Sequence, residues 1–503
     1  MSQADFGSKL NQLKLAGFFD SLEINRGIEK ESLRLNAEGK IASTRHPRAL
    51  GSPLTNPSIT TDFAESLIEL VTPVFQDIDD LYEYLLMLHV FVNQHLNDEV
   101  LWAYSMPPSI DDEDSINIAQ YSDTNAGKIK EIYRRGLKER YGSSMQCIAG
   151  IHFNFSLGSN SLKQLENNSN QENIDEIYLG LIRNFKRYYW FVLSVFGASP
   201  VVDKTFLKGR DHDLDVLGDK NFYKPFATSL RMSDIGYKSF AQKDMDIRYD
   251  SLNEFLQKIK DAILIPFKPF EDIGLKKNSE WLQISTGRLQ IENEYYDSIR
   301  PKRVGNKHLR PHELLLSSGI EYVEVRGIDL SPNEPVGISK DQIRLLDLVL
   351  IYCIILDSPL IDDAESEKIK QNESAVISNG NNPEAKVFFN DKEQFIGTAK
   401  QKVVEKLRML ANVMPNSSEY MNALKSVENE NEIIGSLNNG EIAFTDYGML
   451  KSKLHKSYLS SLEFSDLEKF KDEARESWKN FDKLNTLEEP SIDEFINSYN
   501  SKL

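Results

Sequence analysis

The chain has 503 residues and a mass of 57.5 kDa, and its 59 lysines and arginines against 77 aspartates and glutamates give a formal net charge of −18. This length fits one large domain with a smaller one beside it, and a hydrophobic content of 40% is enough to bury a sizeable core, which excludes a disordered chain. The acidic balance argues against a nucleic-acid binder, because such a protein needs a basic face.

Helical and strand-like patterns alternate between residues 21 and 360. In chain order, we expect a strand at 26–35, helices at 61–70, 77–96 and 125–141, a strand at 147–157, helices at 172–196 and 252–263, strands at 281–291 and 320–328, and a helix at 340–356. Helices and long loops separate the strands by more than hairpin distance. This spacing predicts an α+β fold rather than a β-sandwich.

The last third of the chain changes in composition. Residues 362–393 are rich in Asp, Glu, Asn and Ser, which predicts a loop or linker. Residues 394–503 are rich in Lys, Glu and Leu with a helical period, and predict a helical region that packs on the core. We therefore divide the chain into a core at 1–361, a linker at 362–393 and a helical C-terminal region at 394–503.

Cysteine usage and the lack of long apolar runs suggest the compartment. Cys147 and Cys353 are the two cysteines, too far apart in sequence for a zinc motif or a disulfide framework. The first residues lack the apolar core of a signal peptide, and the strongest apolar run, 345–356, is too short to cross a bilayer. We expect a cytoplasmic protein that binds neither a membrane nor nucleic acid.

Acidic residues within otherwise apolar patterns are the first candidate ligands. Glu29 and Glu31 share one face of the strand at 26–35, where they form either a pair of ligands for a hard divalent cation or a solvated strand end. On a helix at 61–70, Asp62 and Glu65 fit a capping box equally well, whereas Glu69 lies between apolar neighbours and is a plausible ligand.

Two further strands carry candidates. His152 shares a face with Asn154 and is either a ligand or a structural histidine, and Glu324 and Arg326 share a face on which they could simply pair. Several carboxylates with a single histidine and no cysteine favour Mg²⁺ or Mn²⁺ over zinc.

A local basic cluster suggests phosphate. In the segment 289–303, Glu292 and Glu294 share a strand-like face and are followed by Arg300, Lys302 and Arg303, which indicate either a bound phosphate or a solvated charge run. No P-loop, GxGxxG motif after a strand, or GxSxG motif is present. Phosphate chemistry, if present, therefore takes place on a sheet that carries carboxylates.

Seven segments together match the pattern of a known enzyme family, in both sequence and order. They are RGIEKESLRLN, TTDFAESLIELVTP, YRRGLKERYG, IAGIHFNFSL, FATSLRMSDIGY, LQIENEYYDSIRPKR and GIEYVEVRGIDLSP. Between residues 21 and 361 the chain thus resembles the glutamate–cysteine ligases of gammaproteobacterial type. The resemblance implies an antiparallel sheet curled into a funnel, as in the glutamine synthetase-like superfamily, with surrounding helices. It also implies ATP-dependent joining of the L-glutamate γ-carboxyl to the L-cysteine amine through γ-glutamyl phosphate, the first step of glutathione biosynthesis.

The resemblance also assigns roles to residues. It implies Mg²⁺, with Mn²⁺ as an alternative, on Glu29, Glu31, Asp62, Glu69, His152 and Glu324. It places Arg326 and Glu324 in catalysis, with Arg326 facing the transferred phosphate, and Arg231 on the glutamate carboxylate. The residues it implies around cysteine are Tyr133, Arg134, Leu137, Gln146, Tyr237 and Tyr296.

Three other functions remain open at this point. One is a related carboxylate–amine ligase that uses another amine, another is a catalytically inactive sensor of an amino acid or nucleotide, and the third is a metal-dependent phosphohydrolase that would hydrolyse ATP without an amino acid. The retained acids, His152 and Arg326 argue against the sensor, because binding alone does not need phosphoryl-transfer residues. The resemblance further implies a monomer, with glutathione as a feedback inhibitor.

Overall fold

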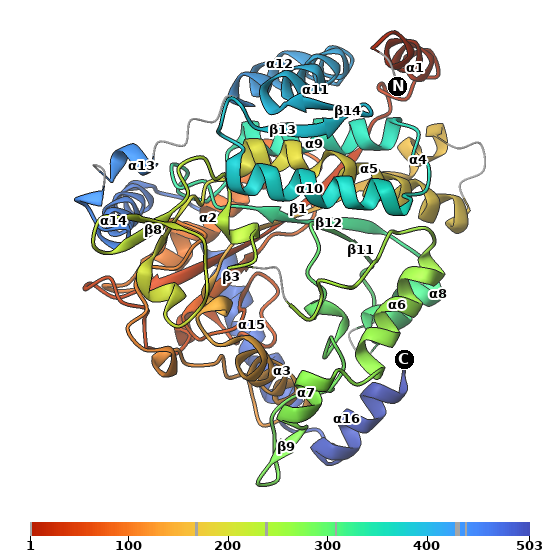
Figure 1. Ribbon diagram of the computed structural model, residues 1–503. Helices are drawn as coiled ribbons and strands as arrows, with labels where there is room; N and C mark the ends of the chain where they lie inside the picture. Colours follow the sequence, from red (N-terminus) through yellow and green to blue (C-terminus); the bar gives the residue numbers. More distant parts are fainter. Residues whose placement is uncertain (1–2, 166–169, 237–239, 307–308, 428–432, 438–439) are drawn as a thin grey trace.

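A seven-stranded antiparallel sheet forms the centre of the computed structural model, which describes residues 3–165, 170–236, 240–306, 309–427, 433–437 and 440–503 (Figure 1). The strand order is β11 (Ile299–Lys302), β12 (Tyr322–Ile328), β5 (Ile151–Leu157), β1 (Ile24–Leu35), β3 (Leu67–Val71) and β2 (Ile59–Thr61), and β4 (Val100–Leu101) pairs with the end of β1. The mixture of this sheet with many helices confirms the predicted α+β class.

Helices cover one face of the sheet, here called the back face. Its side chains, including Ile28, Phe153 and Val325, are fully buried. In Figure 1, α5 (Gln171–Phe196), α9 (Lys340–Ile355) and α10 (Asp363–Asn379) lie above the sheet. α5 packs directly on β11 and β12, where the Tyr189 hydroxyl donates to the Gly327 carbonyl at 3.3 Å. Apolar burial on this face fixes which side of each strand faces forward.

A buried ion pair ties β1 to the helices behind it. Arg26 Nη2 lies 2.7 Å from Asp347 Oδ2 on α9, and Arg26 Nε donates to Asp347 Oδ1 at 2.9 Å. Tyr420, on α12 (Ser417–Ala423), donates its hydroxyl to Asp347 Oδ2 at 2.9 Å. The pair therefore joins three elements that are distant in sequence.

The opposite face, here called the front face, is bordered by shorter elements. Below the sheet in Figure 1 lie α3 (Asn125–Tyr141), α6 (Leu252–Leu264), α7 (Lys268–Ile273) and α8 (Pro311–Ser318). The other elements before the C-terminal region are α1 (Gln3–Leu15), α2 (Ile78–Asn93), α4 (Ser159–Leu165), β6 (Val201–Asp203), β7 (Asp215–Leu217), β8 (Asn221–Tyr223), β9 (Lys276–Lys277) and β10 (Glu280–Trp281).

The C-terminal region is mainly helical, as predicted. It comprises a hairpin of β13 (Lys386–Phe389) and β14 (Lys392–Phe395), followed by α11 (Ile396–Ala411), α12, α13 (Ile433–Ser436), α14 (Phe444–Ser461), α15 (Glu468–Leu484) and α16 (Ile492–Ser501). The predicted loop at 362–393 is wrong, because α10 and the hairpin occupy most of it. Asp362 caps α10 by accepting from the Glu365 N–H, and Ile369, Val376 and Ile377 are buried despite the polar composition. The division into a core and a C-terminal region stays a prediction.

The last helix returns to the front half of the molecule. Ile496 of α16 packs with Ile132 of α3 and with Trp281. Asp493 accepts from Trp281 Nε1 at 2.7 Å, and Arg310 Nη1 donates to the Tyr499 carbonyl at 2.9 Å. The end of the chain therefore supports α3 and the loop beyond β10.

Two predicted elements differ from the structure. The predicted helix at 61–70 is wrong, since β2, a turn and β3 replace it; both faces of β3 are largely enclosed, so its apolar run fits either period. The capping interpretation of Asp62 and Glu65 fails with it. The predicted strand at 281–291 is also wrong, because β10 ends at Trp281 and the following loop is held by side chains such as Gln283.

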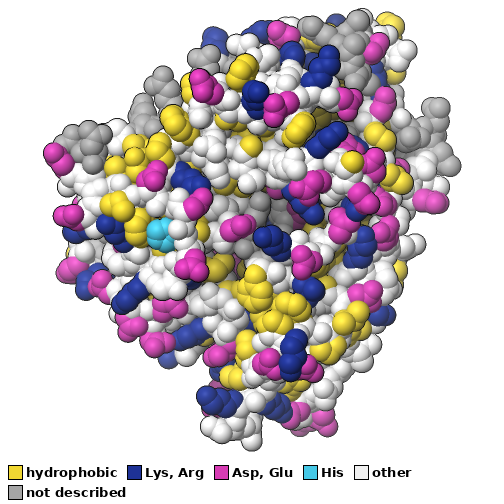
Figure 2. Space-filling view, in the orientation of Figure 1, with side chains coloured by type: hydrophobic (Ala, Val, Ile, Leu, Met, Phe, Trp, Pro, Cys, Tyr) yellow, Lys and Arg dark blue, Asp and Glu magenta, His cyan; other side chains and the backbone are white. Residues whose placement is uncertain are grey.

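Two general expectations can be compared with the structure. Cys147 and Cys353 are both free and buried. Within the described ranges, no helix combines the length and apolar character needed to cross a membrane. Figure 2 shows acidic and basic side chains interspersed over one face of the molecule, so this face has no broad basic surface.

The buried pair at β1 and α9 generates a prediction. Asp347→Asn leaves the Arg26 guanidinium buried without its counter-ion, so we expect a loss of about 3 kcal/mol in the free energy of unfolding by urea. The double variant Arg26→Met with Asp347→Leu should recover more than half of that loss, because it removes both buried charges. A change below about 0.5 kcal/mol in Asp347→Asn would show that the pair does not hold the sheet to α9.

Candidate active site

The strand register gathers charged side chains into one row on the front face. Glu69 of β3 lies opposite Glu31 of β1, and Glu29 of β1 lies opposite His152 of β5. Farther along, Glu324 of β12 lies opposite Asn154 of β5 on one side and Arg300 of β11 on the other. Directly opposite residues have Cα atoms about 4.5–5.5 Å apart, so the row is continuous. Residues far apart in sequence thereby form one site, and Glu29, Glu31, Glu69, His152 and Glu324 all belong to it.

His152 lies between two groups of carboxylates. The first group is Glu29, His152 and Glu324, and the second is Glu31, Glu69 and His152; in each, one potential ligand atom per residue lies within 4.8 Å of the others. His152 Nδ1 is 3.1 Å from Glu29 Oε2, and its Nε2 is 3.7 Å from Glu31 Oε1. Carboxylates and an imidazole at this spacing form a donor set that suits a hard divalent cation.

Neighbouring donors hold two of the carboxylates in place. Asn154 Nδ2 donates to Glu29 Oε1 at 2.9 Å, and the Gly150 N–H donates to Glu31 Oε2 at 3.0 Å. Each of these bonds uses one oxygen of its carboxylate. Asn154 is a residue that the sequence analysis did not select, although its place two residues after His152 on the same face was a usable signal.

Two acids of the cluster, Glu69 and Glu31, have raised pKa values. Burial and then the charges of Glu29, Asp62 and Glu31 hold the pKa of Glu69 well above its ordinary value, and burial raises the pKa of Glu31. Asp62 lies in the turn after β2 and acts on this cluster by its charge, although it belongs to neither of the two close groups. Like charges held together in a buried site are the electrostatic condition that a bound cation relieves.

Cations surround the acid at the other end of the row. Arg300 Nη2 lies 2.6 Å from Glu324 Oε2, Arg326 Nη1 lies 3.0 Å from the same oxygen, and Lys302 Nζ lies 3.3 Å from Oε1. Burial opposes ionisation of Glu324, but these three cations together hold its pKa well below its ordinary value. The third member of the predicted basic cluster is elsewhere, because Arg303 Nη1 donates to the Ser318 and Gly319 carbonyls.

Arg231 lies beside the row, against the backbone of β5. Its Nη2 donates to the Arg326 carbonyl at 3.0 Å, and its Nη1 is 3.5 Å from Asp329 Oδ1. A methyl group at Gly150 would lie 2.1 Å from Arg231 Nη2, so only glycine admits the guanidinium here. The structure therefore places Arg231 next to the row, and its role on the glutamate carboxylate stays a prediction.

The predicted cysteine pocket centres on α3, and its members differ in their surroundings. Arg134 donates to the carbonyls of Asp62 and Lys130, which ties α3 to the turn after β2. Burial and then the charges of Glu294 and Asp62 hold the pKa of the Tyr133 hydroxyl well above its ordinary value. Leu137 is buried, and Gln146 lies in the 3₁₀ turn before β5.

The two remaining tyrosines of this prediction are placed differently. The Tyr296 N–H donates to Gln242 Oε1 at 2.9 Å, which fixes its backbone in the loop before β11. Tyr237 lies outside the described residues.

Glu294, which the sequence analysis assigned to a strand face, is a buried acid that supports this pocket. Glu294 accepts from Arg140 Nη1 at 2.9 Å and from the Tyr141 hydroxyl at 3.0 Å, both on α3. It also accepts from the Gln290 N–H at 2.7 Å. Glu294 therefore fastens the loop before β11 to α3, a role that needs the tertiary structure to be recognised.

Comparisons with known proteins agree with this geometry. The sequence profile of the family described as glutamate-cysteine ligase matches residues 10–376. A glutamate–cysteine ligase of Hahella chejuensis is 48% identical over 364 residues, which cover 71% of this chain and 69% of that protein. One from Pseudomonas fluorescens is 38% identical over 496 residues, which cover 95% and 93%.

Solved structures show the same similarity. The crystal structure of the Francisella tularensis glutamate–cysteine ligase in complex with AMP has a TM-score of 0.88 and 34% identity, covering 95% of this chain and 98% of that one. A bifunctional glutathione synthetase of Pasteurella multocida shares the fold at 22% identity, with a TM-score of 0.66 over 91% of this chain and 54% of that one.

The raised pKa of Glu69 gives a prediction about the metal-free protein. A carboxyl whose folded pKa is raised stabilises the fold most below its unfolded pKa, near 4.5, and that contribution is lost as the pH rises through the folded pKa. In EDTA at pH 7.5, Glu69→Gln should therefore be more stable than the wild type by more than about 0.5 kcal/mol, and the difference should shrink towards pH 4.5.

The matched control for this prediction is Glu324→Gln. It should lower stability at pH 7.5, because the lowered pKa of Glu324 reflects favourable pairing with three cations. Urea unfolding at several pH values measures both variants. A Glu69→Gln protein that is less stable than the wild type at pH 7.5 in EDTA would contradict the electrostatic interpretation.

Proposed function

The chain belongs to the glutamate–cysteine ligase family, and we propose that the row of charged side chains on β3, β1, β5, β12 and β11 is where it carries out that reaction. ATP phosphorylates the γ-carboxylate of L-glutamate, and the amine of L-cysteine then displaces phosphate. The products are γ-glutamylcysteine, ADP and phosphate, which is the first step of glutathione biosynthesis. The observation that carries this assignment of the site is the register that aligns Glu69, Glu31, Glu29, His152 and Glu324.

The two steps have a simple chemical reason. A carboxylate is a poor acceptor for an amine, because its charge repels nucleophiles and oxide is a poor leaving group. Phosphorylation of one carboxylate oxygen ends the sharing of its negative charge with the carbonyl group. The oxygen then leaves as part of phosphate. The site must therefore bring two anions together, the γ-carboxylate and the terminal phosphate of ATP, and must hold the charge that builds up between them.

The acidic half of the row fits Mg²⁺, and Mn²⁺ suits the same donors. Glu29, Glu31, Glu69, His152 and Glu324 would hold the ions, with Asp62 adding charge from its turn; the raised pKa values of Glu69 and Glu31 support this fit. Bound ions would neutralise phosphate charge during the transfer. Asn154 and the Gly150 N–H restrain Glu29 and Glu31 through the bonds described above, which keeps the donors oriented for the nucleotide.

The basic half of the row fits the transferring phosphoryl group. Arg326 lies on the same face as Glu324, two residues along β12, and its Nη1 is held by Glu324 Oε2. We assign Arg326 to the phosphoryl oxygens, with Lys302 beside it. Arg300 is nearly enclosed and donates to Glu324 and to the Asn293 and Tyr295 carbonyls, so it acts mainly by positioning Glu324. Arg303 faces other carbonyls and is not part of this proposal.

The two amino-acid substrates fit opposite edges of the row. Arg231, beside Gly150 and Arg326, would pair with the α-carboxylate of glutamate. Tyr133, Leu137, Gln146 and Tyr296 would surround cysteine, with Arg134 holding α3 in place. The raised pKa of Tyr133 keeps its hydroxyl protonated and able to donate a hydrogen bond.

We further infer a monomeric cytoplasmic enzyme that glutathione inhibits. Two buried free cysteines fit a reducing compartment. Glutathione contains the γ-glutamylcysteinyl unit, so it would compete for the same subsites as glutamate and cysteine. Sedimentation of the purified protein and inhibition assays against each substrate test these inferences.

The first experiment measures ADP release by the purified protein with ATP and Mg²⁺, adding glutamate and cysteine singly and together. We expect release to require both amino acids and mass spectrometry to detect γ-glutamylcysteine. Release with glutamate and another amine, but not with cysteine, would reassign the substrate. Nucleotide binding without turnover under any pairing would contradict catalysis.

Glu324 provides the first test by substitution. Glu324→Gln removes the charge that organises Arg326 and the ligand group around His152, so we expect kcat/KM to fall by at least about 100-fold while the protein stays folded by circular dichroism. The matched control is Glu321→Gln, because the Glu321 carboxylate is exposed, lies outside the row and accepts from the Val304 N–H at 3.0 Å. A Glu324→Gln enzyme with near wild-type turnover would remove Glu324 from the site.

Tyr296 tests the cysteine pocket. In Tyr296→Phe the loss of one hydroxyl hydrogen bond should raise KM for cysteine by about fivefold, with KM for glutamate nearly unchanged. Tyr458→Phe, at an exposed position on α14, serves as the control and should leave both constants unchanged. Equal increases in both KM values would place Tyr296 outside the cysteine subsite.

A further inference from the structure

A buried lysine lies directly behind the acidic cluster. Lys30 stands between Glu29 and Glu31 on β1, so its side chain projects to the back face. Only 3% of Lys30 is exposed. Arg26, on the same face of β1, is paired with Asp347, but among the described residues no carboxylate or other acceptor bonds to Lys30 Nζ. An ammonium group that is buried without a counter-ion is costly, and burial lowers the pKa of Lys30 to about 7.

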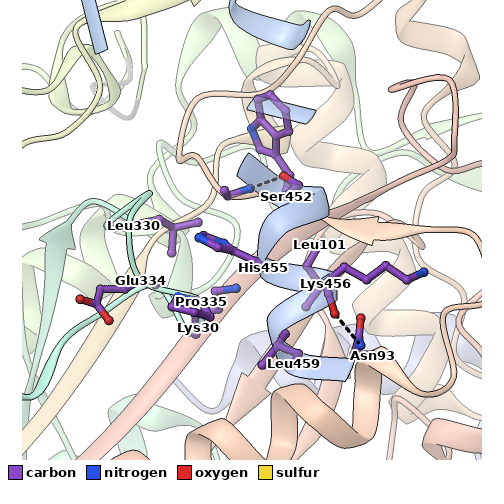
Figure 3. A pocket seen from close by; sticks show the side chains of 13 residues that line it. Lys30, Asn93, Leu101, Leu330, Glu334, Pro335, Ser452, His455, Lys456 and Leu459 are labelled. Carbon is purple, nitrogen blue, oxygen red and sulfur yellow. Dashed lines mark hydrogen bonds between the residues drawn. The ribbon is translucent and has the colours of Figure 1, made fainter. Parts of the chain in front are cut away.

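Lys30 lines a small pocket that opens to solvent. Figure 3 shows Lys30 of β1 close to His455 of α14, with Leu101 and Leu459 nearby. The pocket thus combines apolar walls with polar side chains, among them Lys30 and His455. It lies on the opposite side of the sheet from the proposed catalytic row.

The charges around this pocket favour an anion. Glu334 is the acid in the described lining, and its carboxylate accepts from the Tyr82 hydroxyl at 3.5 Å rather than pairing with Lys30. Lys456 lies at the rim, where its Nζ donates to the Glu99 carbonyl at 2.8 Å. Burial lowers the pKa of His455 to about 4, so its ring is neutral near pH 7 but can still donate an N–H.

A second histidine adds to the polar character of this region. His89 of α2 is fully buried, and its Nδ1 bonds to the Leu85 carbonyl at 2.7 Å. Its Nε2 is buried without a hydrogen-bond partner in the described structure. Burial and then the charge of Lys30 lower the pKa of both His89 and His455.

We propose that this back-face pocket binds a compact inorganic anion, held by the Lys30 ammonium and the His455 ring. The anion supplies the counter-ion that the protein does not provide, and the apolar walls limit its hydration. Chloride and inorganic phosphate share the required chemistry. Because Lys30 lies between two proposed metal ligands in sequence, the anion would bind to the rear of the strand that carries them.

The test measures the thermal unfolding midpoint of the full chain, without nucleotide or amino acids, in sodium gluconate, chloride or phosphate at equal ionic strength and pH 7. Chloride or phosphate should raise the midpoint of the wild type by about 2 °C or more over gluconate. Lys30→Met should lose at least three quarters of this rise. Lys268→Met, which removes an exposed lysine, should keep it.

Chloride-35 NMR gives a direct reading of binding. The wild type should broaden the chloride line, and Lys30→Met should abolish most of the excess width. If Lys30→Met does not fold, His455→Leu replaces it and should weaken binding at least threefold. A rise with phosphate alone identifies phosphate as the anion. Equal responses of the wild type and the Lys30 and His455 variants to every salt would overturn the proposal, whether or not the protein ligates glutamate and cysteine.

Discussion

The register of β1 against its two neighbours is the constraint on which the site depends. Side chains alternate between the faces of a strand, so a slip of one residue would turn Glu29 and Glu31 towards the helices and bring Lys30 to the front. The back face prevents such a slip, because Ile28 would lose its apolar contacts and Arg26 would lose Asp347. The packing of α5 and α9 thus maintains the chemistry on the other side of the sheet.

The row is electrostatically polarised along its length. At one end, burial and the charges of neighbouring acids raise the pKa values of Glu69 and Glu31. At the other end, Glu324 is surrounded by cations and remains ionised. In the proposed function, a nucleotide phosphate would meet positive charge from both directions, from arginine and lysine at one end and from metal ions bound to the acids at the other. The fold holds these opposing charges close together because their strands are fixed from behind.

The sequence predicted the parts of this site that depend on local alternation. Glu29, Glu31, His152 and Glu324 occupy the faces expected from the period of two. Glu69 lies in the row but was predicted on a helix, since a short apolar run fits both periods when both faces are enclosed.

Other features required tertiary information. The orientation of Arg303 depends on where the 318–319 turn lies, and the capture of Glu294 by Arg140 depends on the approach of α3. Family resemblance named residues of the substrate pocket, but the order in which β11, β12, β5, β1 and β3 stand side by side emerges only from the folded chain.

The return of α16 to the front half has a consequence for the synthesis of the protein. A chain emerging from the ribosome exposes β1 and α3 long before Ile496 and Tyr499, which pack against α3 and Arg310, have been made. The loop beyond β10 therefore gains its contacts with α16 only after the last residues of the chain have been synthesised. A purification tag is accordingly better placed at the N-terminus, and a premature stop codon within the last helix would remove contacts that brace the substrate side of the molecule.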